Sequence, residues 1–239
     1  MYNTDNYLFE IHRSVEMNKL FDLNNPFFSF LSKVADLIIL SFLWFVCCLP
    51  IVTIGPSSSA LYYVMLKIAR KEDVRVTATF FKGFKDNFKQ GIAYSFIFVI
   101  LGAVLVLDYI IAMGMPGTAG AVSCGIFFAM GVWMCCTMFY TFPLQAQFYN
   151  TVKQTLINAM ILAARKFLMT VVVFAVNMLP VIVFLWATPL FFQTAPIWVL
   201  VYPGLAARIC SWMFVKVFDP LIEAATGKKT GEEDAEDEE

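Results

Sequence analysis

The feature that most constrains this chain is a series of apolar stretches, each close to the length that crosses a lipid bilayer. Roughly 20 apolar residues span a hydrocarbon core about 30 Å thick. The clear stretches are Val34–Ile54, Ile92–Met113, Gly120–Phe142, Leu168–Thr188 and Pro196–Val217. A sixth, Ser57–Ala69, covers only about 20 Å as a helix. With 60% hydrophobic and 15% charged residues, the chain is predicted to be an all-α, polytopic membrane protein.

The distribution of basic residues indicates how many stretches cross. Lys and Arg gather in the segments 65–91 and 143–167, whereas the connections Met115–Gly120 and Pro189–Pro196 carry no charge. The positive-inside rule places the basic segments in the cytoplasm. If Ser57–Ala69 also crosses, both termini are cytoplasmic and only Arg208 lies away from that side. We therefore predict six membrane segments, with an outer turn near Pro56.

The six segments are predicted to form a helical bundle of three hairpins, about 27–71, 79–148 and 155–222. Each is opened by an amphipathic elbow helix on the cytoplasmic surface, with apolar side chains toward lipid and basic ones toward water. Basic residues of the elbows are expected to contact lipid headgroups or a partner: Lys82, Lys85, Lys89, Arg165 and Lys166. Residues 1–226 then form a single membrane domain, and residues 227–239 a disordered acidic tail.

The sequence carries no recognisable enzyme motif. It has no phosphate-binding loop, dinucleotide fingerprint, nucleophile elbow or zinc-protease motif. Its six cysteines form no CxxC pair and its single histidine is His12, so we expect no metal site and no cofactor. The buried thiols are interpreted as small apolar side chains. Nothing indicates nucleic-acid binding, and we predict that the protein is not an enzyme.

Polar side chains inside the apolar stretches are the first functional candidates, because an ionisable group is costly in a membrane. Arg208 lies near the middle of the last stretch and Asn177 at comparable depth in the one before. We predict a contact between them. Asp36 lies near the cytoplasmic end of the first stretch and Asp108 toward the outer end of Ile92–Met113. These residues either bind a substrate or hold helices together.

The segment Gly55-Pro56-Ser57-Ser58-Ser59 is a second candidate, because it has the composition of a helix start. Proline suits the first helical turn, and hydroxyl groups satisfy free backbone amides. A helix N-terminus at the membrane can receive an anion, as broken helices of transporters do. The alternative is a capped turn at the outer surface.

Several segments together resemble the YesL-like family of bacterial integral membrane proteins, whose members have no established activity. The resemblance covers nearly the whole chain, and its specific part is the first ninety residues. The segments that carry it are Asn25-Pro26-Phe27-Phe28, Lys33-Val34-Ala35-Asp36-Leu37, Leu49-Pro50-Ile51-Val52-Thr53-Ile54-Gly55-Pro56, Ala60-Leu61-Tyr62-Tyr63 and Phe80–Gln90. It implies a place in the bacterial cytoplasmic membrane beside carbohydrate ABC transporters. It supplies no catalytic residues.

Two functions follow. The first is a non-catalytic accessory or regulatory protein that associates with the lipid bilayer and with permease subunits of a carbohydrate ABC transporter, or forms a homo-oligomer. The second is a small transporter or channel-like protein for a sugar or an anionic solute, with its site around Arg208. They differ in one structural expectation. A transporter should have a cavity lined by Arg208, whereas an accessory protein should bury Arg208 in a dry interior.

Overall fold

The computed structural model describes residues 26–226 of the chain, and every regular element within that range is a helix. In chain order the elements are α2 (Pro26–Cys48), the short 3₁₀ helix η1 (Ile51–Thr53), α3 (Ile54–Ala69), α4 (Val76–Asp86), α5 (Phe88–Met113), α6 (Gly117–Gln147), α7 (Val152–Arg165), α8 (Phe167–Trp186), α9 (Thr188–Gln193), α10 (Ala195–Leu200) and α11 (Tyr202–Thr226). The predicted all-helical class is confirmed. The predicted acidic tail lies outside the described residues.

Within the described residues, five helices are long and apolar enough to cross a membrane. They are Leu31–Cys48, Ile51–Ala69, Phe88–Met113, Gly117–Gln147 and Phe167–Trp186. This set includes the short stretch 57–69 but not the stretch Pro196–Val217. Pro196 and Pro203 are the second residues of α10 and α11, because proline favours the first turn of a helix and interrupts an existing one. The last apolar stretch is therefore divided at Val201.

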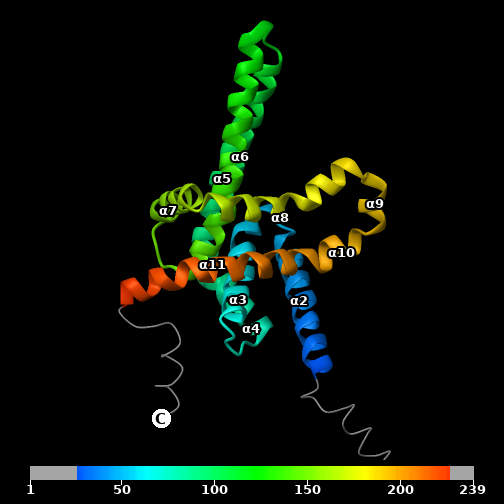
Figure 1. Cartoon of the computed structure of the whole chain (residues 1–239), viewed down its shortest axis with the longest axis vertical. Coiled ribbons are helices and arrows are strands. Elements are labelled where there is room, and N and C mark those ends of the chain that lie inside the picture. The colour runs from blue at the N-terminus through cyan, green and yellow to red at the C-terminus, as the bar shows by residue number, and fades with distance from the viewer. Residues whose placement is uncertain (1–25, 227–239) are drawn as a thin grey trace, which may run out of the picture.

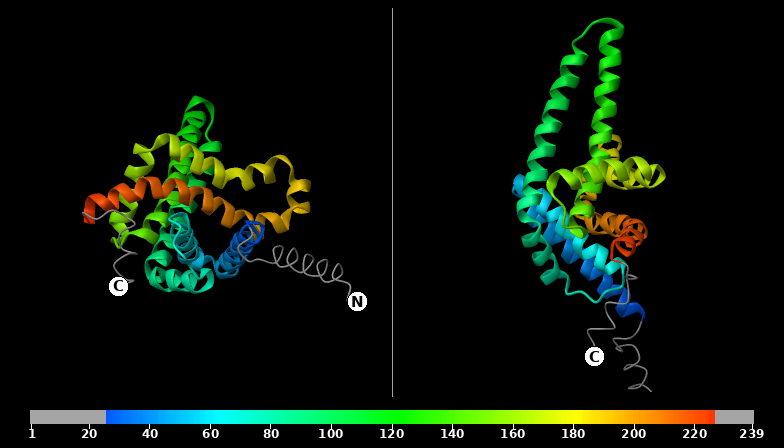
Figure 2. Two further views of the ribbon diagram at one scale, coloured as in Figure 1. Left: turned by 60° about the horizontal axis from the view of Figure 1, so that its bottom comes forward. Right: turned by 90° about the vertical axis from the view of Figure 1, so that its left-hand side faces the viewer.

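Three antiparallel pairs of helices organise the fold (Figure 1). The pair α2–α3 and the short helix α4 lie at one end, and the long hairpin α5–α6 projects from the other. The helices α8 and α11, joined through α9 and α10, run crosswise to α5–α6, as both views in Figure 2 agree. The separate helices α4 and α7 precede α5 and α8, at the positions of two predicted elbows. The third predicted elbow is continuous with α2.

The central helix is α3, which packs against α2, α4, α5, α6 and α11. In the candidate span that contains α3, Ile51–Ala69, 56% of the apolar membrane-length segment is buried, whereas the buried share is 11% in each of the other four candidate spans. Small side chains explain this, since Gly55, Ser57, Ser59 and Ala60 let neighbouring backbones approach closely. Farther along, aromatic rings fill the space between α3, α6 and α11.

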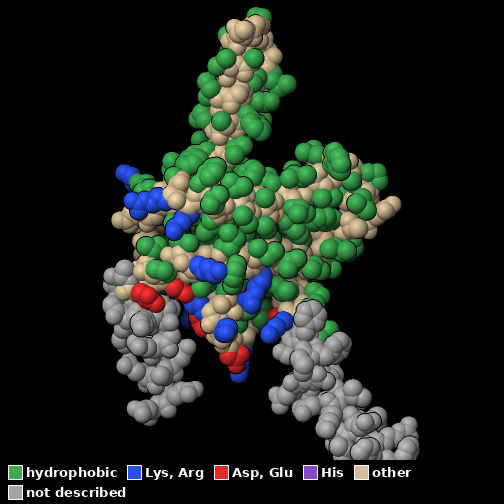
Figure 3. All heavy atoms as spheres, viewed as in Figure 1, with side chains coloured by type: hydrophobic (Ala, Val, Ile, Leu, Met, Phe, Trp, Pro, Cys, Tyr) green, Lys and Arg blue, Asp and Glu red, His purple; other side chains and the backbone are tan. Residues whose placement is uncertain are grey.

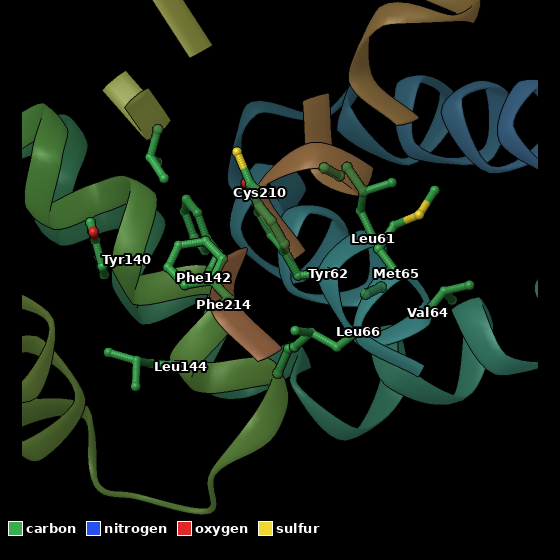
Figure 4. Close-up of a cluster of buried hydrophobic side chains, with 14 of the residues drawn as sticks. Leu61, Tyr62, Val64, Met65, Leu66, Tyr140, Phe142, Leu144, Cys210 and Phe214 are labelled. Carbon is green, nitrogen blue, oxygen red and sulfur yellow. The ribbon is translucent and has the colours of Figure 1, made fainter. Parts of the chain in front are cut away.

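The aromatic cluster is drawn in Figure 4. Phe214 of α11 makes edge-to-face contacts with Tyr62 of α3 at 6.1 Å and with Tyr140 of α6 at 5.1 Å between ring centroids. Phe218 stacks on Phe214 one turn later. Edge-to-face geometry places the positive edge of one ring on the negative face of another. These contacts pack α11 against α3 and α6.

The turn before α3 makes a contact with α5 that the charge pattern did not predict. The backbone amide of Gly55 donates to Ser95 Oγ at 2.9 Å, and Gly55 packs directly on Gly91. Gly91 follows Lys89 by only two residues, whereas opposite sides of a bilayer are about 20 helical residues apart. The prediction of six crossings places the turn at the outer face and Lys89 in the cytoplasm. A full bilayer between the turn and Lys89 does not fit the direct contact between Gly55 and Gly91.

The hairpin α5–α6 is apolar on its outward surface. Ile100, Val106, Ile111 and Phe128 are each more than half exposed. Figure 3 shows that Lys and Arg side chains gather on the lower part of this face, whereas the projecting hairpin presents apolar and backbone atoms. Contiguous exposed apolar surface of this extent is typical of a protein embedded in lipid. The described residues therefore have the character of a multi-pass membrane protein.

Candidate functional site

The helix crossing that positions Arg208 is formed by α2 and α11. The amide of Gly204 donates to Ser41 Oγ at 2.9 Å, and that hydroxyl donates to the carbonyl oxygen of Leu37 at 2.8 Å. A Cβ atom at position 204 would lie 2.6 Å from Ser41 Oγ, so only glycine permits this approach. One turn along α11 from this crossing is Arg208, and just over one turn back along α2 is Asp36. Both side chains therefore emerge on the same side of the crossing.

Arg208 and Asp36 line one cavity of about 1020 Å³, enclosed by α2, the end of α3, the turn between α3 and α4, and α11. Apolar side chains such as Leu37, Met65 and Ile68 form part of its wall. The charged residues that line it are Lys33, Asp36, Lys71, Glu72, Asp73 and Arg208. The structure thus brings together two of the residues singled out from the sequence.

The guanidinium group of Arg208 is the most unusual group in this cavity. Its Nη1 atom is buried and has no hydrogen-bond partner among the described residues. Two other buried atoms share that state, Tyr94 Oη and Ser211 Oγ, but neither belongs to a charged side chain. Arg208 as a whole is partly exposed, but a buried guanidinium donor that is left without an acceptor is unfavourable. Across the cavity, Asp36 also has no ion-pair partner within the described part of the chain.

The turn between α3 and α4 is held in place from both sides. Arg70 donates from Nε and Nη2 to Asp219 Oδ1 at 3.0 and 2.9 Å, and from Nη1 to Gln147 Oε1 at 2.8 Å. On the other side, Lys67 pairs with Glu72 at 2.6 Å. One arginine therefore joins the ends of α3 and α6 to α11. The cavity lies between this junction and the crossing at Gly204.

Asn177 and Asp108 lie apart from the cavity. The side-chain amide of Asn177 donates to the carbonyl oxygen of Val173 at 2.8 Å and to Cys210 Sγ at 3.7 Å. It therefore joins α8 to α11, but through Cys210 and not through Arg208. Asp108 lies half-exposed on α5, toward the end of the projecting hairpin. Neither residue lines the cavity that holds Arg208.

The segment Gly55–Ser59 is buried at the centre of the helices, and its hydroxyl groups are used internally. Ser57 donates to Thr53 O at 2.7 Å, and Ser58 Oγ accepts from Trp44 Nε1 at 3.3 Å. Ser59 donates to Gln145 Oε1 at 2.6 Å. The Gln145 amide in turn donates to the carbonyl oxygen of residue 87 at 3.1 Å. We interpret this helix start as a packing contact between α2, α3, α5 and α6.

The five basic residues expected to contact lipid or a partner are all exposed: Lys82, Lys85, Lys89, Arg165 and Lys166. They lie on α4, at the start of α5, and at the end of α7. No group of three or more potential metal ligands occurs within the range that the structure describes. Residues that the sequence reasoning missed are Arg70, Lys71 and Gln145. A charged residue next to the end of an apolar stretch was the available signal for the first two.

Comparison with known proteins gives one match. Residues 37–109 match a family described as "Protein of unknown function, DUF624". The matched part is less than a third of the chain. It contains the second half of α2, all of α3 and α4, and most of α5, including the Gly55–Gly91 contact and Lys71, whereas Arg208 lies outside it. No curated protein and no solved structure matches the chain. Residues 37–109 thus resemble a domain of unknown function.

Proposed function

We propose that this chain is a non-catalytic, multi-pass membrane protein that binds a small polar solute in the cavity lined by Arg208. The observation that supports the proposal is the buried Nη1 atom of Arg208, which has no partner among the described residues. A guanidinium group is always charged and offers its donors in a fixed planar arrangement. A solute with an acceptor oxygen would satisfy this donor, which the described part of the chain leaves unpaired.

The opposite wall suits the same kind of ligand. Asp36 offers acceptor oxygens to hydroxyl groups, and Arg208 offers donors, without an ion pair between the two. Sugars and their acid derivatives carry both donors and acceptors on a compact ring or chain. Cavities for such ligands measure roughly 300–1,000 Å³, comparable to the volume of about 1020 Å³ found here. Of the two functions considered from the sequence, this geometry favours the second.

Binding to the purified protein in lipid nanodiscs tests the proposal. The probes are glucose, gluconate and inorganic phosphate, each titrated while heat released and unfolding temperature are measured. We expect at least one probe to bind the wild type, and Arg208→Gln to weaken that binding about a hundredfold, as loss of a buried charged hydrogen bond does. Since no hydrogen bond or ion pair joins Arg208 to another residue within 26–226, Arg208→Gln should remain folded.

The control is Lys153→Gln, which removes a charge from the exposed face of α7. It should bind like the wild type. If none of the three probes binds, or if Arg208→Gln binds as tightly as the wild type, the proposal is overturned. Flux of the bound probe into liposomes then distinguishes a transporter from a protein that only binds.

A role beside a carbohydrate ABC transporter is the second candidate, and it is compatible with solute binding. It is supported by the resemblance of the first ninety residues, within which most of the matched segment 37–109 falls. In this role the cavity would sense a solute, and a surface outside it would contact the permease. Pull-down of the tagged full chain from native membranes should recover permease subunits. Recovery of none would exclude this role.

A further inference from the structure

Lys71 occupies a backbone position that normally belongs to glycine. It follows the last turn of α3 with a φ of 67°, and it is the one non-glycine residue with positive φ in the part of the chain that the structure describes. Its amide bonds to Ile68 O at 3.1 Å and that of Glu72 to Lys67 O at 3.2 Å, which closes the helix end. Glycine predominates at such positions because a Cβ atom is strained there.

The side chain of Lys71 explains why a lysine is useful at this position. Lys71 lines the same cavity as Arg208. Its two neighbours in the chain are both fixed, Arg70 by Asp219 and Glu72 by Lys67. The turn therefore presents the ammonium group of Lys71 from a backbone that is held on either side. Lys71 itself makes no ion pair with any other described residue.

The charges that remain in the cavity favour an anion. Glu72 is neutralised by Lys67 at 2.6 Å. The remaining lining charges are the cations Lys33, Lys71 and Arg208 and the acids Asp36 and Asp73, an excess of one positive charge. Arg208 lies on the inner wall with a buried donor, and Lys71 lies exposed at the rim. An anionic group between the two would be contacted from both sides.

We infer that the solute of this cavity is an anion, bearing a carboxylate or phosphate group held between Arg208 and Lys71, and that Lys71 stands at a glycine-type position because it makes this contact. The inference rests on the proposed function and adds the chemical class of the ligand. It implies that Lys71 lowers the stability of this turn and strengthens binding of the anion. Such a combination is a common property of functional sites.

Three substitutions at one position test this trade. Lys71→Gly should raise the unfolding temperature by about 2–4 °C, the shift expected from relief of a strained residue in a chain of this size. It should also weaken binding of gluconate and inorganic phosphate about tenfold, as loss of an exposed ionic contact does. Lys71→Arg should keep the affinity, whereas Lys71→Ala should lose it without the gain in stability. Lys153→Ala, on α7, should change neither property.

The outcomes separate this inference from the proposed function. Glucose should bind at least tenfold more weakly than gluconate, because it lacks the charge. If glucose binds as tightly as gluconate and still depends on Arg208, the solute site stands and the anion assignment is wrong. If Lys71→Gly is stabilised but binds gluconate and phosphate like the wild type, the Lys71 contact is wrong. If no probe binds, the proposed function itself fails.

Discussion

Gly55→Ala is the sharpest test of the helix packing, because the two helices touch backbone to backbone there. A Cβ atom on Gly55 would overlap the carbonyl oxygen of Gly91 and lie 2.6 Å from Ser95 Oγ. In the same way, a Cβ atom on Gly91 would lie 2.5 Å from the backbone nitrogen of Pro56. Either substitution must push α3 and α5 apart.

The expected loss has two parts. Forcing a methyl group into a closely packed contact costs about 1–3 kcal/mol. Separation also weakens the hydrogen bond from Gly55 N to Ser95 Oγ, now 2.9 Å long, which is worth about 1 kcal/mol. Alanine returns a few tenths of a kcal/mol through helix propensity. The net loss is about 2–3 kcal/mol, or a fall in unfolding temperature of about 5–10 °C.

The assay is thermal unfolding in detergent, followed by a dye that fluoresces on reaction with thiols. Cys136 and Cys210 are buried and free, whereas the other four cysteines are partly exposed, so the additional reaction that appears on heating reports separation of the helices. Gly125→Ala is the matched control, because an added Cβ atom there has no neighbour within 4 Å. It should unfold at or above the wild-type temperature.

A double variant completes the test. Gly55→Ala and Gly91→Ala affect the same contact, so together they should cost less than the sum of the two, by at least about 1 kcal/mol. The packing argument is refuted if Gly55→Ala unfolds at the wild-type temperature. It is also refuted if Gly125→Ala lowers that temperature as much.

Three further outcomes are expected in the same unfolding assay. Arg70→Gln and Asp219→Asn should each lower the free energy of unfolding by about 2–3 kcal/mol, since the pair joins α3 to α11 at 2.9 Å with both side chains largely buried. A double-mutant cycle should show favourable coupling between them. Additive losses would exclude the bond. Gln145→Ala should cost about 2–3 kcal/mol because it removes the acceptor of Ser59 in a buried site, and an unchanged melting curve would contradict this. Asp36→Asn should be neutral or stabilising by up to about 1 kcal/mol, because the carboxylate has no ion-pair partner among the described residues; a loss as large as that of Asp219→Asn would reveal a missed partner.

Sequence patterns predicted the helical class and most helix positions, because long apolar stretches are unambiguous. The same patterns did not predict which apolar stretches form continuous helices and which lie at the centre of the fold. Pro196–Val217 counts as one clear stretch by composition, yet a new helix, α11, begins within it at Tyr202. Ser57–Ala69 counts as marginal, yet it lies within the most buried of the candidate spans. Hydropathy measures affinity for lipid, whereas a central helix needs small and polar side chains that fit its neighbours.

The candidate site was predictable only in part. Arg208 and Asp36 stand out because charges are rare in apolar stretches, but nothing in the sequence indicates that they share a cavity. Their proximity depends on the close approach of Gly204 to Ser41, which lie far apart in the chain. The charge of Lys71 at the end of an apolar stretch is visible in the sequence, but its left-handed backbone is not, because that depends on how α3 ends. The outer turn near Pro56 stays a prediction, and charge counts could not show that Gly55 contacts Gly91.

The enclosure of α3 has a consequence for how the protein is made. Of the five membrane-length segments, α3 has the lowest hydropathy and the largest buried share. Its glycine, proline and serines favour the membrane weakly when a ribosome first releases them. The side chains that later satisfy them, Ser95 and Gln145, are synthesised afterwards. During synthesis there is therefore a stage at which α3 lacks α5 and α6, and at which α2 is its one neighbour among the described helices.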